Sequence, residues 1–516
     1  MRIGVDVGGT NTDAVLVDGL DVQAEAKTAT TPDVTGGIVA ALRALVESSG
    51  VAASRIQAVM IGTTHFTNAV VEARRLAPTG VIRLGLPATQ ALPPTTGWPA
   101  ALRDALGGHV YLCHGGHEFD GQRIAPVDRE ELRRAAADLG SKGITTVAIS
   151  SVFSPVNAEA EQEAASVIAE ELPDAALSLS HEIGRIGLLE RENATIMNAC
   201  LRELASGIVG AFQTALAELG IEALVYLSQN DGTLMTVDYA ERYPVATFAS
   251  GPTNSMRGAA FLSGLGDCAV VDIGGTTSDV GILRHGFPRE ASGAVEVGGV
   301  RTNFRMPDVL SLGIGGGSHV DGSEVGPQSV GYELTSRALV FGGDTLTATD
   351  LAVAAGLADL GDPSRVAGLD PGPALQRIED RISETLDRMK TSADPIPVVV
   401  VGGGSILLRD SLTGASELVK PEHFAVANAI GAAIAQAGGE VDKVVALEGT
   451  TREAALEEAK AEAVDKAVAA GAEHDSVQVV DVEDVPIAYL PGNATRIKVK
   501  AVGDLDLGRV GVAAGR

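Results

Sequence analysis

A short stretch that occurs twice constrains this chain more than any other feature of its sequence. Near the start, an apolar run leads into Asp6-Val-Gly-Gly-Thr-Asn-Thr-Asp13, and 266 positions later another leads into Asp272-Ile-Gly-Gly-Thr-Thr-Ser-Asp279. In each copy an Asp precedes the Gly-Gly pair and a second Asp follows it at the same spacing. Two copies of one device predict two related halves, each beginning with a β-hairpin that turns at the glycines.

The residues of this device suit the binding of a phosphate and a magnesium ion. Two glycines let the backbone turn tightly without a Cβ in the way, so that amide groups can approach a phosphate oxygen. An Asp at the end of a buried strand offers oxygen ligands, which Mg²⁺ prefers while it keeps several of its waters. A single Gly-Gly between two strands is more often an ordinary hairpin. The repetition is what favours phosphate binding.

The composition restricts the partners that this chain can have. The 516 residues include 39 Lys and Arg against 67 Asp and Glu, which gives a net charge of −28. A nucleic acid or an anionic membrane would need a basic face, so neither is expected. Three scattered cysteines suit a reducing compartment, no leader precedes the first strand, and no apolar run reaches the roughly 18 residues of a membrane span. We therefore expect a cytoplasmic protein with several domains.

A third glycine turn follows an apolar strand in the second half. The predicted strand at residues 396–401 leads directly into Gly402-Gly-Gly-Ser405. Such a turn lets the backbone lie flat against a planar ligand or a ribose phosphate, and an ordinary strand-to-helix turn is the alternative. Ser, Thr and Asn also gather at the predicted helix start in residues 249–256, which is a natural anion-binding geometry.

Two further stretches concentrate polar side chains. The loop Gly62-Thr-Thr-His-Phe-Thr-Asn68 holds more hydrogen-bonding side chains than helix capping needs, so it either caps the next helix or contacts substrate or nucleotide. Residues 109–117 hold His109, Cys113, His114 and His117, whose spacing would allow a zinc site. A polar pocket lined by these histidines, or ordinary surface histidines, are the alternatives.

Seven motifs together resemble the hydantoinase/oxoprolinase family, the ATP-dependent subunits of N-methylhydantoinases, oxoprolinases, caprolactamases and ketone carboxylases. They are Asp6–Asp13, Gly62–Asn68, Ser180-His-Glu-Ile183, Asn193-Ala-Thr-Ile-Met-Asn198, Ser250-Gly-Pro252, Asp272–Asp279 and Gly313-Ile-Gly-Gly-Gly-Ser318. The three glycine turns resemble the first phosphate loop, the second phosphate loop and the adenosine loop of the actin, sugar-kinase and heat-shock-ATPase superfamily. The resemblance covers roughly residues 1–435.

The resemblance implies an α/β fold with two related actin-like (ribonuclease H-like) domains that flank an ATP cleft. We expect an N-terminal domain with the first phosphate loop at residues 1–190 and a second actin-like domain with the other two loops at residues 191–440. A small α/β region, in which we find no chemical constellation, would close the chain at residues 441–516.

The resemblance also implies a role for each residue of the site. Asp6 and Asp272 would hold Mg²⁺ through its waters, Asp13 or Asp279 would orient the attacking group, and His65 and Asn68 would contact substrate. The ATP-binding residues would be Gly8, Gly9, Thr10, Asn11, Thr12, Gly274, Gly275, Thr276, Thr277, Gly402, Gly403 and Gly404. If Cys113, His114 and His117 bind a second metal, it would be zinc.

The implied reaction is ATP- and Mg²⁺-dependent phosphorylation of a carbonyl oxygen and hydrolysis of a cyclic amide such as a hydantoin, 5-oxoproline or lactam. A ketone carboxylase subunit, a small-molecule kinase and a non-catalytic nucleotide sensor stay open as alternatives. A second, separately encoded subunit and an oligomeric assembly are expected from the family. Where many relatives carry Pro-Gly-Pro-Ala-Cys-Tyr-Gly, this chain has Tyr332-Glu-Leu-Thr-Ser-Arg337, which indicates a shorter branch.

Overall fold

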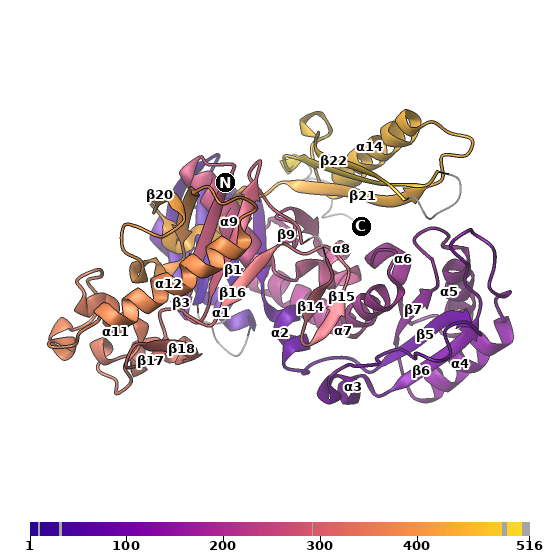
Figure 1. The fold of residues 1–516 in the computed structure, drawn as a ribbon, viewed down its shortest axis with the longest axis horizontal. Coiled ribbons are helices and arrows are strands. Elements are labelled where there is room, and N and C mark those ends of the chain that lie inside the picture. The colour runs from indigo at the N-terminus through magenta and orange to yellow at the C-terminus, as the bar shows by residue number, and fades with distance from the viewer. Residues whose placement is uncertain (9–10, 30–33, 292, 488–492, 508–516) are drawn as a thin grey trace.

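The first copy of the repeat lies in the largest sheet of the molecule. In the computed structural model, which describes residues 1–8, 11–29, 34–291, 293–487 and 493–507, nine strands pair in the order β22-β23-β21-β10-β9-β4-β1-β2-β3. Their bounds are β1 (Arg2–Val7), β2 (Asn11–Asp18), β3 (Asp21–Ala29), β4 (Ala58–Thr63), β9 (Leu224–Ser228), β10 (Leu234–Thr236), β21 (Ala437–Val445), β22 (Gln478–Pro486) and β23 (Thr495–Gly503). We call this the first sheet (Figure 1).

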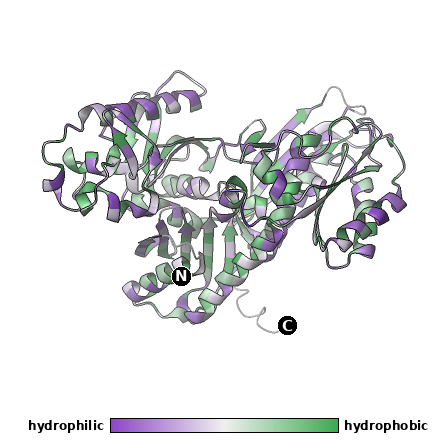
Figure 2. Ribbon diagram, turned by 90° about the horizontal axis from the view of Figure 1, so that it is seen from below, coloured by the Kyte–Doolittle hydropathy of each residue, from purple (hydrophilic) through white to green (hydrophobic). Residues whose placement is uncertain are grey.

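Helices cover both faces of the first sheet because its central strands are apolar on both sides. Ile3 and Val5 of β1 pack in one core with α1 (Val34–Ser49) and α7 (Leu188–Glu218). On the opposite face, Val15 and Val17 of β2 pack against α13 (Ala427–Ile434). Alternate residues of a strand point to opposite faces, so a strand without polar positions must be covered on both faces. Figure 2 shows the same pattern, with hydrophobic strands at the centre and mixed helices outside.

The second copy of the repeat lies in a smaller sheet, the second sheet. Five strands pair in the order β13-β12-β11-β19-β20, and β16 also pairs with β12. Their bounds are β11 (Cys268–Ile273), β12 (Ser278–Arg284), β13 (Phe287–Pro288), β16 (Val309–Leu312), β19 (Ile396–Val401) and β20 (Ala415–Val419). The helix α12 (Gly372–Met389) packs on one face and α9 (Ser250–Ser263) on the other.

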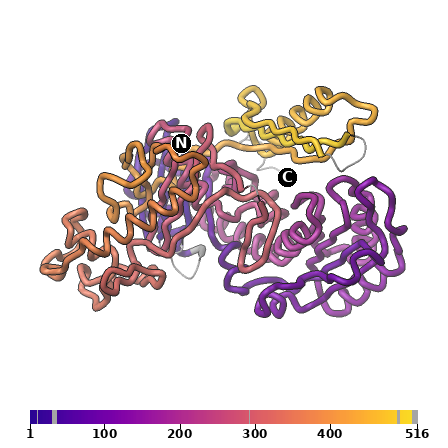
Figure 3. The backbone as a smooth tube through the Cα atoms, in the orientation of Figure 1, coloured from indigo at the N-terminus to yellow at the C-terminus, as the bar shows by residue number. Residues whose placement is uncertain are grey.

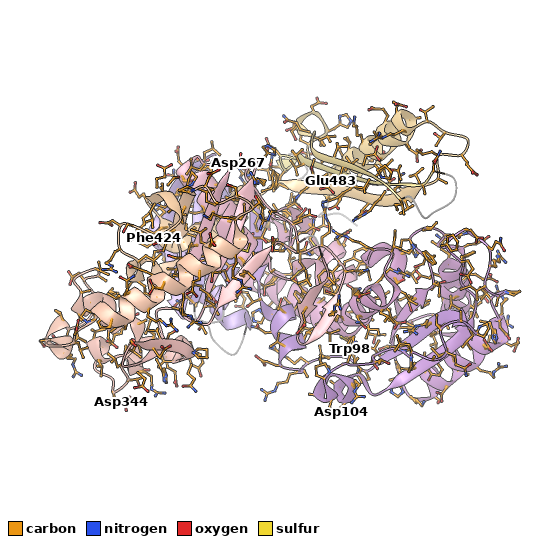
Figure 4. All side chains as sticks on the ribbon, viewed as in Figure 1. Trp98, Asp104, Asp267, Asp344, Phe424 and Glu483 are labelled. Atoms are coloured by element: carbon orange, nitrogen blue, oxygen red, sulfur yellow. The ribbon has the colours of Figure 1, made fainter. Side chains whose placement is uncertain are left out.

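Smaller elements lie between the strands of the second sheet along the chain. The hairpin of β14 (Val295–Val297) with β15 (Val300–Thr302) packs against α7 in the core of the first sheet. The hairpin of β17 (Ser318–Asp321) with β18 (Glu324–Ser329) and the short helices α10 (Leu334–Arg337) and α11 (Ala348–Ala354) lie on the outer side of the second sheet (Figure 1). The elements α11, β17 and β18 extend to one end of the molecule, where Asp344 is labelled in Figure 4.

The chain leaves the first sheet after α2 (His65–Val71) and forms an insertion with its own parallel sheet (Figure 3). Its strands are β5 (Thr79–Leu86), β6 (His109–His114), β7 (Thr146–Ser151) and β8 (Ala176–Leu179), in the order β6-β5-β7-β8. Its helices are α3 (Ala100–Leu106), α4 (Arg129–Ser141), α5 (Glu159–Glu171) and α6 (Ser180–Ile183). The first sheet resumes with β9, which follows the long helix α7 and precedes β10 and α8 (Val237–Arg242).

Buried ion pairs join the insertion to α7. Glu192 pairs with Arg83 at 2.5 Å, and both side chains are almost fully buried. Arg191 is also buried and donates from Nε to Ser180 at 2.8 Å. Arg191 and Glu192, near the start of α7, therefore hold the insertion in place. The Trp98 indole adds a bond to Asn193 at 2.9 Å (Figure 4).

The two sheets contact each other through α9 and α13. A Cβ built on Gly258 of α9 would lie 1.9 Å from the Ala427 carbonyl oxygen, and one built on Gly431 of α13 would lie 1.8 Å from the Asn254 carbonyl oxygen. The helices can approach this closely only because glycine stands at both crossing points. The Ala-rich sequence of residues 425–438 predicts a single helix, but the helix ends at Ile434 and β21 begins at Ala437.

The end of the chain extends the first sheet. Strands β21, β23 and β22 continue the sheet beyond β10, and α14 (Arg452–Ala469) packs on them with alanines at every fourth position. The boundaries expected at residues 190 and 440 stay a prediction, and the strand pairing itself places β9, β10 and β21 in the first sheet. Within the described part of the chain, no helix is long and apolar enough to cross a membrane.

Ion pairs hold this end of the chain against the rest of the molecule. On β23, Lys498 contacts Glu290 of the second sheet's outer segment at 2.7 Å, and Lys500 contacts Asp231 at 2.8 Å. Arg305 pairs with both Glu290 and Glu440. The insertion joins the group through Arg185, whose Nε lies 3.5 Å from Asp442. We call this group, Arg185, Asp231, Glu290, Arg305, Glu440, Asp442, Lys498 and Lys500, the ionic junction.

Candidate functional site

The two copies of the repeat form hairpins with the same register. Asp6 stands opposite Asp13 in the pair β1–β2, and Asp272 stands opposite Asp279 in the pair β11–β12. Each turn is closed by the same backbone bond, from Gly8 to Asn11 at 3.0 Å and from Gly274 to Thr277 at 2.9 Å. Each first strand also pairs in parallel with a strand on its other side, β4 in one half and β19 in the other.

The strand-end carboxylates of the two hairpins lie close enough to interact. Asp6 is 4% exposed, and its burial, then the Asp13 carboxylate, raise its pKa to about 7, with a smaller contribution from Asp272. Burial also raises the pKa of Asp272, with Asp13 adding to the effect. Because Asp6 and Asp13 come from one sheet and Asp272 from the other, the hairpins face each other.

Amide groups and one ammonium group hold the first pair of carboxylates. The Asn428 side chain on α13 donates to Asp6 and to Asp13, in both cases at 3.0 Å. The Lys27 ammonium lies 2.7 Å from Asp13 Oδ1. Asp6 Oδ1 is buried without a hydrogen bond of good geometry among the described residues, although the nearby Asn254 amide lowers the pKa of this carboxyl.

The second pair of carboxylates is half-buried, and Asp272 lies beside the third glycine turn. Burial raises the pKa of Asp279 to about 7, although a hydrogen bond from Ser311 lowers it. The Ser255 hydroxyl at the start of α9 lowers the pKa of Asp272. A Cβ built on Gly402 would lie 2.2 Å from Asp272 Oδ1. Gly402 has a φ of +84°, so this position needs glycine both for its conformation and for space.

The glycine turns differ in how exposed their residues are. Gly9 and Thr10 lie outside the described residues. Thr12 is buried, whereas Thr276 and Thr277 are exposed. The run Gly315-Gly-Gly317 covers the other side of the second turn, because its amides donate to the carbonyls of Gly274 and Gly275 at 3.0 and 2.7 Å. The third turn packs on the same place, since a Cβ on Gly404 would lie 2.8 Å from the Gly274 carbonyl oxygen. Gly403 lies between these contacts and Lys27.

The loop after β4 is the counterpart in the first sheet of the third glycine turn in the second. Gly62 stands opposite Asp6 in the β1–β4 pair, as Val401 stands opposite Asp272 in the β11–β19 pair. The ends of β4 and β19 are therefore equivalent positions in the two sheets. The chain continues from β4 into Thr63 to Asn68, and from β19 into Gly402 to Gly404. A Cβ on Gly62 would lie 2.4 Å from both Asp6 Oδ1 and Asn254 Nδ2, so this position also requires glycine.

Hydrogen bonds hold the polar side chains of this loop in place. His65 Nδ1 lies 2.6 Å from the Thr63 hydroxyl, and Asn68 donates to Thr64 at 3.4 Å. The Thr64 hydroxyl in turn donates to the Val7 carbonyl at 3.3 Å, which fixes the loop to the end of β1. Burial, with Arg75 nearby, lowers the pKa of His65 to about 4, so the imidazole is neutral at neutral pH.

The structure does not bring the three residues of the zinc prediction together. Cys113 packs in the apolar core of the insertion, and burial raises the pKa of its thiol to about 12. His114, the next residue of the strand, binds Glu131 at 2.9 Å, and His117 is buried with neither ring nitrogen hydrogen-bonded. Neighbouring residues of a strand point to opposite faces, which separates Cys113 from His114. Across the described residues, no three His, Cys, Asp or Glu side chains form a metal site.

Several residues of the site were not predicted. Lys27, Ser311 and Asn428 carried no signal in the motif itself, while Asn254 and Ser255 lie in the helix start that was identified as an anion-binding geometry. Asn428 is separated from Asp13 by 415 positions, so only the folded structure brings them together.

The carboxylate group fits a hydrated Mg²⁺ bound with a nucleotide. Asp6 and Asp13 are buried and Asp272 is half-buried. The charges of Asp13 and Asp272 raise the pKa of Asp6, and the charge of Asp13 raises the pKa of Asp272, so the site has a strongly negative potential. Among the described residues, Asp6 Oδ1 also lacks a hydrogen bond. A divalent cation relieves such repulsion, and Mg²⁺ reaches carboxylates through its waters without a group of direct ligands. The fit concerns Asp6, Asp13 and Asp272, and the turns beside them supply backbone amides.

Two parts of the chain match known protein families. Residues 2–172 match the family described as "Hydantoinase/oxoprolinase N-terminal region", and residues 191–360 match the one described as "Hydantoinase/oxoprolinase". The chain belongs to the hydantoinase/oxoprolinase family. This membership confirms the resemblance inferred from the seven motifs.

Relatives in this hydantoinase/oxoprolinase family include subunits of larger enzymes. The caprolactamase subunit alpha of Pseudomonas jessenii is 27% identical over 424 residues, which is 75% of this chain and 59% of that protein. The acetophenone carboxylase gamma subunit of Aromatoleum aromaticum is 26% identical over 444 residues, which is 74% of this chain and 57% of that protein. The chain thus spans less than three fifths of the length of these relatives.

Two solved structures have the same fold. The ATP-dependent caprolactamase of Pseudomonas jessenii aligns with a TM-score of 0.76 at 18% identity, over 98% of this chain and 87% of that one. A nucleotide-free acetone carboxylase structure aligns with a TM-score of 0.68 at 18% identity, over 98% and 88%. At this identity the likeness concerns the fold alone. The expected α/β architecture with two related actin-like domains is confirmed.

Proposed function

We propose that this chain uses ATP and Mg²⁺ to phosphorylate a carbonyl oxygen of a small cyclic amide, which prepares the ring for hydrolysis. The observation that carries the proposal is the pair of facing hairpins with buried strand-end aspartates in equal register. The names of its relatives support an amide or ketone as the class of substrate. When bound, ATP supplies the phosphoryl group and Mg²⁺ neutralises its charge.

In this proposal the chain's own residues do mostly positioning and charge stabilisation. Asp6 and Asp272 hold the hydrated cation from the two sheets. The Gly8 and Gly274 amides close their own turns, so the remaining backbone amides of these two turns would bind phosphate oxygens, and the turn at Gly402 to Gly404 would contact the adenosine. Phosphorylation of the carbonyl oxygen makes the carbonyl carbon more electrophilic, so that water can attack it. The C–N bond of the resulting tetrahedral species then breaks, with a proton going to the ring nitrogen, and a second water hydrolyses the acyl phosphate that remains to the ring-opened acid and phosphate.

Of the two outer aspartates, Asp279 is the better proton acceptor. Asp13 is engaged by Lys27 at 2.7 Å and by Asn428 at 3.0 Å, so its oxygens are already occupied. Asp279 has a pKa raised to about 7, so near neutral pH both of its protonation states are populated. A general base works best when its pKa lies near the working pH. We therefore assign proton transfer or orientation of the attacking group to Asp279.

The loop after β4 is assigned to the substrate. It occupies in the first sheet the place that the proposed adenosine turn occupies in the second, so it faces the cleft from the side opposite the nucleotide base. His65 is neutral and held through Nδ1, which leaves Nε2 to hydrogen-bond a substrate carbonyl or N–H. Asn68, one helical turn on, offers an amide that can both donate and accept.

A second candidate function is a ketone carboxylase subunit, which the acetophenone and acetone carboxylase relatives favour. The first chemical step would be the same, because a ketone enolate also presents an oxygen for phosphorylation. Relatives of both kinds are named as subunits, so we include a separately encoded partner, and a larger assembly formed with it, in the proposal.

The test measures ATP turnover by the purified chain with Mg²⁺ against hydantoins, 5-oxoproline, lactams and small ketones, with ADP, phosphate and organic product quantified. Substrate-stimulated ADP with one ring-opened acid per ADP supports the amide proposal. Turnover that requires bicarbonate together with a ketone supports the carboxylase. A stable phosphorylated product would instead identify a kinase. ADP formation that no amide or ketone stimulates, by the chain alone or together with a partner subunit, would contradict both candidates.

A further inference from the structure

Lys27 occupies a position at which it touches both halves of the site. It stands directly opposite Asp13 in the β2–β3 pair, and its ammonium group lies 2.7 Å from Asp13 Oδ1. The same ammonium group lies 3.2 Å from the carbonyl oxygen of Ala425, which follows the second sheet. A Cβ built on Gly403 would lie 4.0 Å from it, so the third glycine turn is its neighbour.

The charge of Lys27 acts on carboxylates of both hairpins. It pairs with Asp13 of the first sheet and lowers the pKa of Asp272 of the second. Among the described residues, no other Lys or Arg is recorded in an ion pair with Asp6, Asp13, Asp272 or Asp279. One cation therefore serves a site with four carboxylates, which a triphosphate would make still more negative.

A phosphate group would be a better partner for this ammonium than its present ones. Charge-assisted bonds to phosphate are strong, and a lysine beside the β- and γ-phosphates is a recurrent means of stabilising phosphoryl transfer. The side chain is 37% exposed, so it is free to change rotamer without breaking a packed core. Its donors can be shared among Asp13, the Ala425 carbonyl and a ligand, because an ammonium group has three.

We propose that Lys27 binds the phosphates of the nucleotide and, through Ala425, couples that binding to the contact between the two sheets. This inference rests on the proposed function, since it takes the nucleotide as the ligand of the site. It adds a ligand residue that lies on β3, outside all three glycine turns.

A second contact between the same two segments supplies a matched control. Glu25, two residues before Lys27 on β3, accepts from or pairs with His423 Nδ1 at 3.0 Å. This pair is half exposed and joins β3 to residue 423, as Lys27 joins it to residue 425, but no contact with a site aspartate is recorded for it in the described structure. Glu25→Gln thus weakens the contact between the sheets without changing the charge next to Asp13.

The experiment measures the binding of ATP, ADP and adenosine with Mg²⁺ to the whole chain by calorimetry, for the wild type, Lys27→Met, Lys27→Arg and Glu25→Gln. We expect Lys27→Met to weaken ATP binding about 10- to 100-fold and adenosine binding less than about twofold, because a charge-assisted bond to phosphate is lost. Lys27→Arg should restore part of the ATP affinity. Glu25→Gln should change ATP affinity by no more than about threefold.

The outcomes separate this inference from the proposed function. If the wild type binds ATP and Lys27→Met binds it equally well, or loses ATP and adenosine in the same proportion, Lys27 is only a structural contact and the inference is overturned. If the wild type binds no ATP, the proposed function fails and the inference fails with it. Lys27→Gln, which keeps a donor toward Asp13, replaces Lys27→Met should that variant not fold, with the same expected loss for ATP.

Discussion

At the scale of single residues, the site was predictable where the motif itself carries the chemistry. Asp6, Asp13, Asp272 and Asp279 could be placed because each lies at a counted distance from a glycine turn. Lys27 could not, for a physical reason: counting back from the turn of the β2–β3 hairpin would set Asp13 opposite residue 26. A bulge between Leu16 and Val17 moves the pairing by one residue, and only this slip turns Lys27 to the face of Asp13.

The strand-end aspartate of the second hairpin should be needed for turnover but not for folding. We expect Asp272→Asn to lower ATP turnover at least about a thousandfold, because it removes a charge that holds the cation and adds no bulk. Thermal unfolding should be unchanged or shifted upward, since a buried carboxylate with a raised pKa is replaced by a neutral group. Phosphate release and a melting curve measure both effects.

Asp267 provides the control for this variant. It precedes the same strand, is exposed, and pairs only loosely with Arg284 at 3.8 Å (Figure 4). Asp267→Asn should leave turnover within about twofold of the wild type. Full activity in Asp272→Asn would refute the assignment of this residue to the magnesium ion.

The raised pKa of Asp6 predicts how stability depends on pH. A carboxyl whose folded pKa lies near 7, above its unfolded value of 3.8, binds its proton more tightly when folded. The free energy of unfolding should therefore fall as pH rises from about 4 to about 7 and level off above that. Asp6→Asn removes the effect, so its stability relative to the wild type should increase between pH 5 and pH 8 by on the order of 2 to 3 kcal/mol.

Urea unfolding at the two pH values, without nucleotide, measures this difference. The matched variant is Asp18→Asn, at the exposed end of β2, for which the difference from the wild type should be nearly the same at both pH values. Added Mg²⁺ should stabilise the wild type more at pH 8 than at pH 5, because only the ionised carboxylates attract the cation. A stability difference between Asp6→Asn and the wild type that stays constant with pH would show that Asp6 has an ordinary pKa.

At the scale of elements, the helices with clear periodicity were predicted well and the Ala- and Gly-rich stretches were not. The sequence of residues 188–218 predicts one long helix, and α7 spans Leu188 to Glu218. Residues 425–438 were predicted as a single helix because alanine favours helix everywhere, but Gly438 and Gly439 belong to β21. A Cβ on Gly439 would lie 2.2 Å from the Ala463 carbonyl oxygen, so these glycines serve the packing of α14, which no local pattern reveals.

The crossing of α9 and α13 should be intolerant of even one methyl group. In Gly258→Ala the new Cβ would meet the Ala427 carbonyl at 1.9 Å, so the helices must separate. We expect a loss of roughly 2 to 4 kcal/mol in the free energy of unfolding, together with weaker ATP binding, because this crossing sets how the hairpins face each other.

Gly207→Ala is the control, because it also lies within a helix but has no neighbouring atom within 4 Å of the added Cβ. It should be neutral or should stabilise by about 0.5 to 1 kcal/mol, since alanine loses less backbone entropy than glycine on folding. Denaturant unfolding of both variants gives the comparison. Equal effects would mean that the crossing has no special role.

At the scale of the whole molecule, the ionic junction brings together parts that the sequence suggested as separate. The C-terminal region was expected as a small unit with no chemistry of its own, and runs of charge such as those it carries are usually solvated. Instead, Lys498 and Lys500 on β23 are buried against Glu290 and Asp231. The sequence of β23 alternates Lys with Ile, Val and Ala. This pattern does not indicate whether the lysines face water or pair with acidic side chains more than 200 positions away, as Lys498 does with Glu290.

Breaking the Lys500–Asp231 pair should destabilise the protein strongly. The two groups lie 2.8 Å apart, and burial lowers the pKa of Lys500 although Asp231 raises it. Lys500→Met would leave the Asp231 charge buried and unpaired, at a cost of about 3 to 5 kcal/mol. The double variant Lys500→Met with Asp231→Leu should recover most of this loss, which a double-mutant cycle in urea measures.

The exposed pair of Lys466 and Glu462 on α14, with a similar separation of 3.0 Å, is the comparison. Lys466→Met should cost no more than about 0.5 kcal/mol, because solvent screens that pair. A loss in Lys500→Met as small as that in Lys466→Met would mean that water reaches the junction.

Because the first sheet is continuous, a rotation at one end of it is amplified into a larger displacement at the other end. Strand β22 lies six positions from β1 in the sheet, which at the usual strand spacing is roughly 30 Å. A rotation of the first hairpin by about 10° would therefore carry β22 through roughly 5 Å. Lys498 would move with the first sheet, whereas Glu290 belongs to the segment after β13 of the second sheet. Each rotation would therefore lengthen the ion pair between them. A movement too small to detect at the glycine turns could thus be recorded as a displacement at the far end of the sheet.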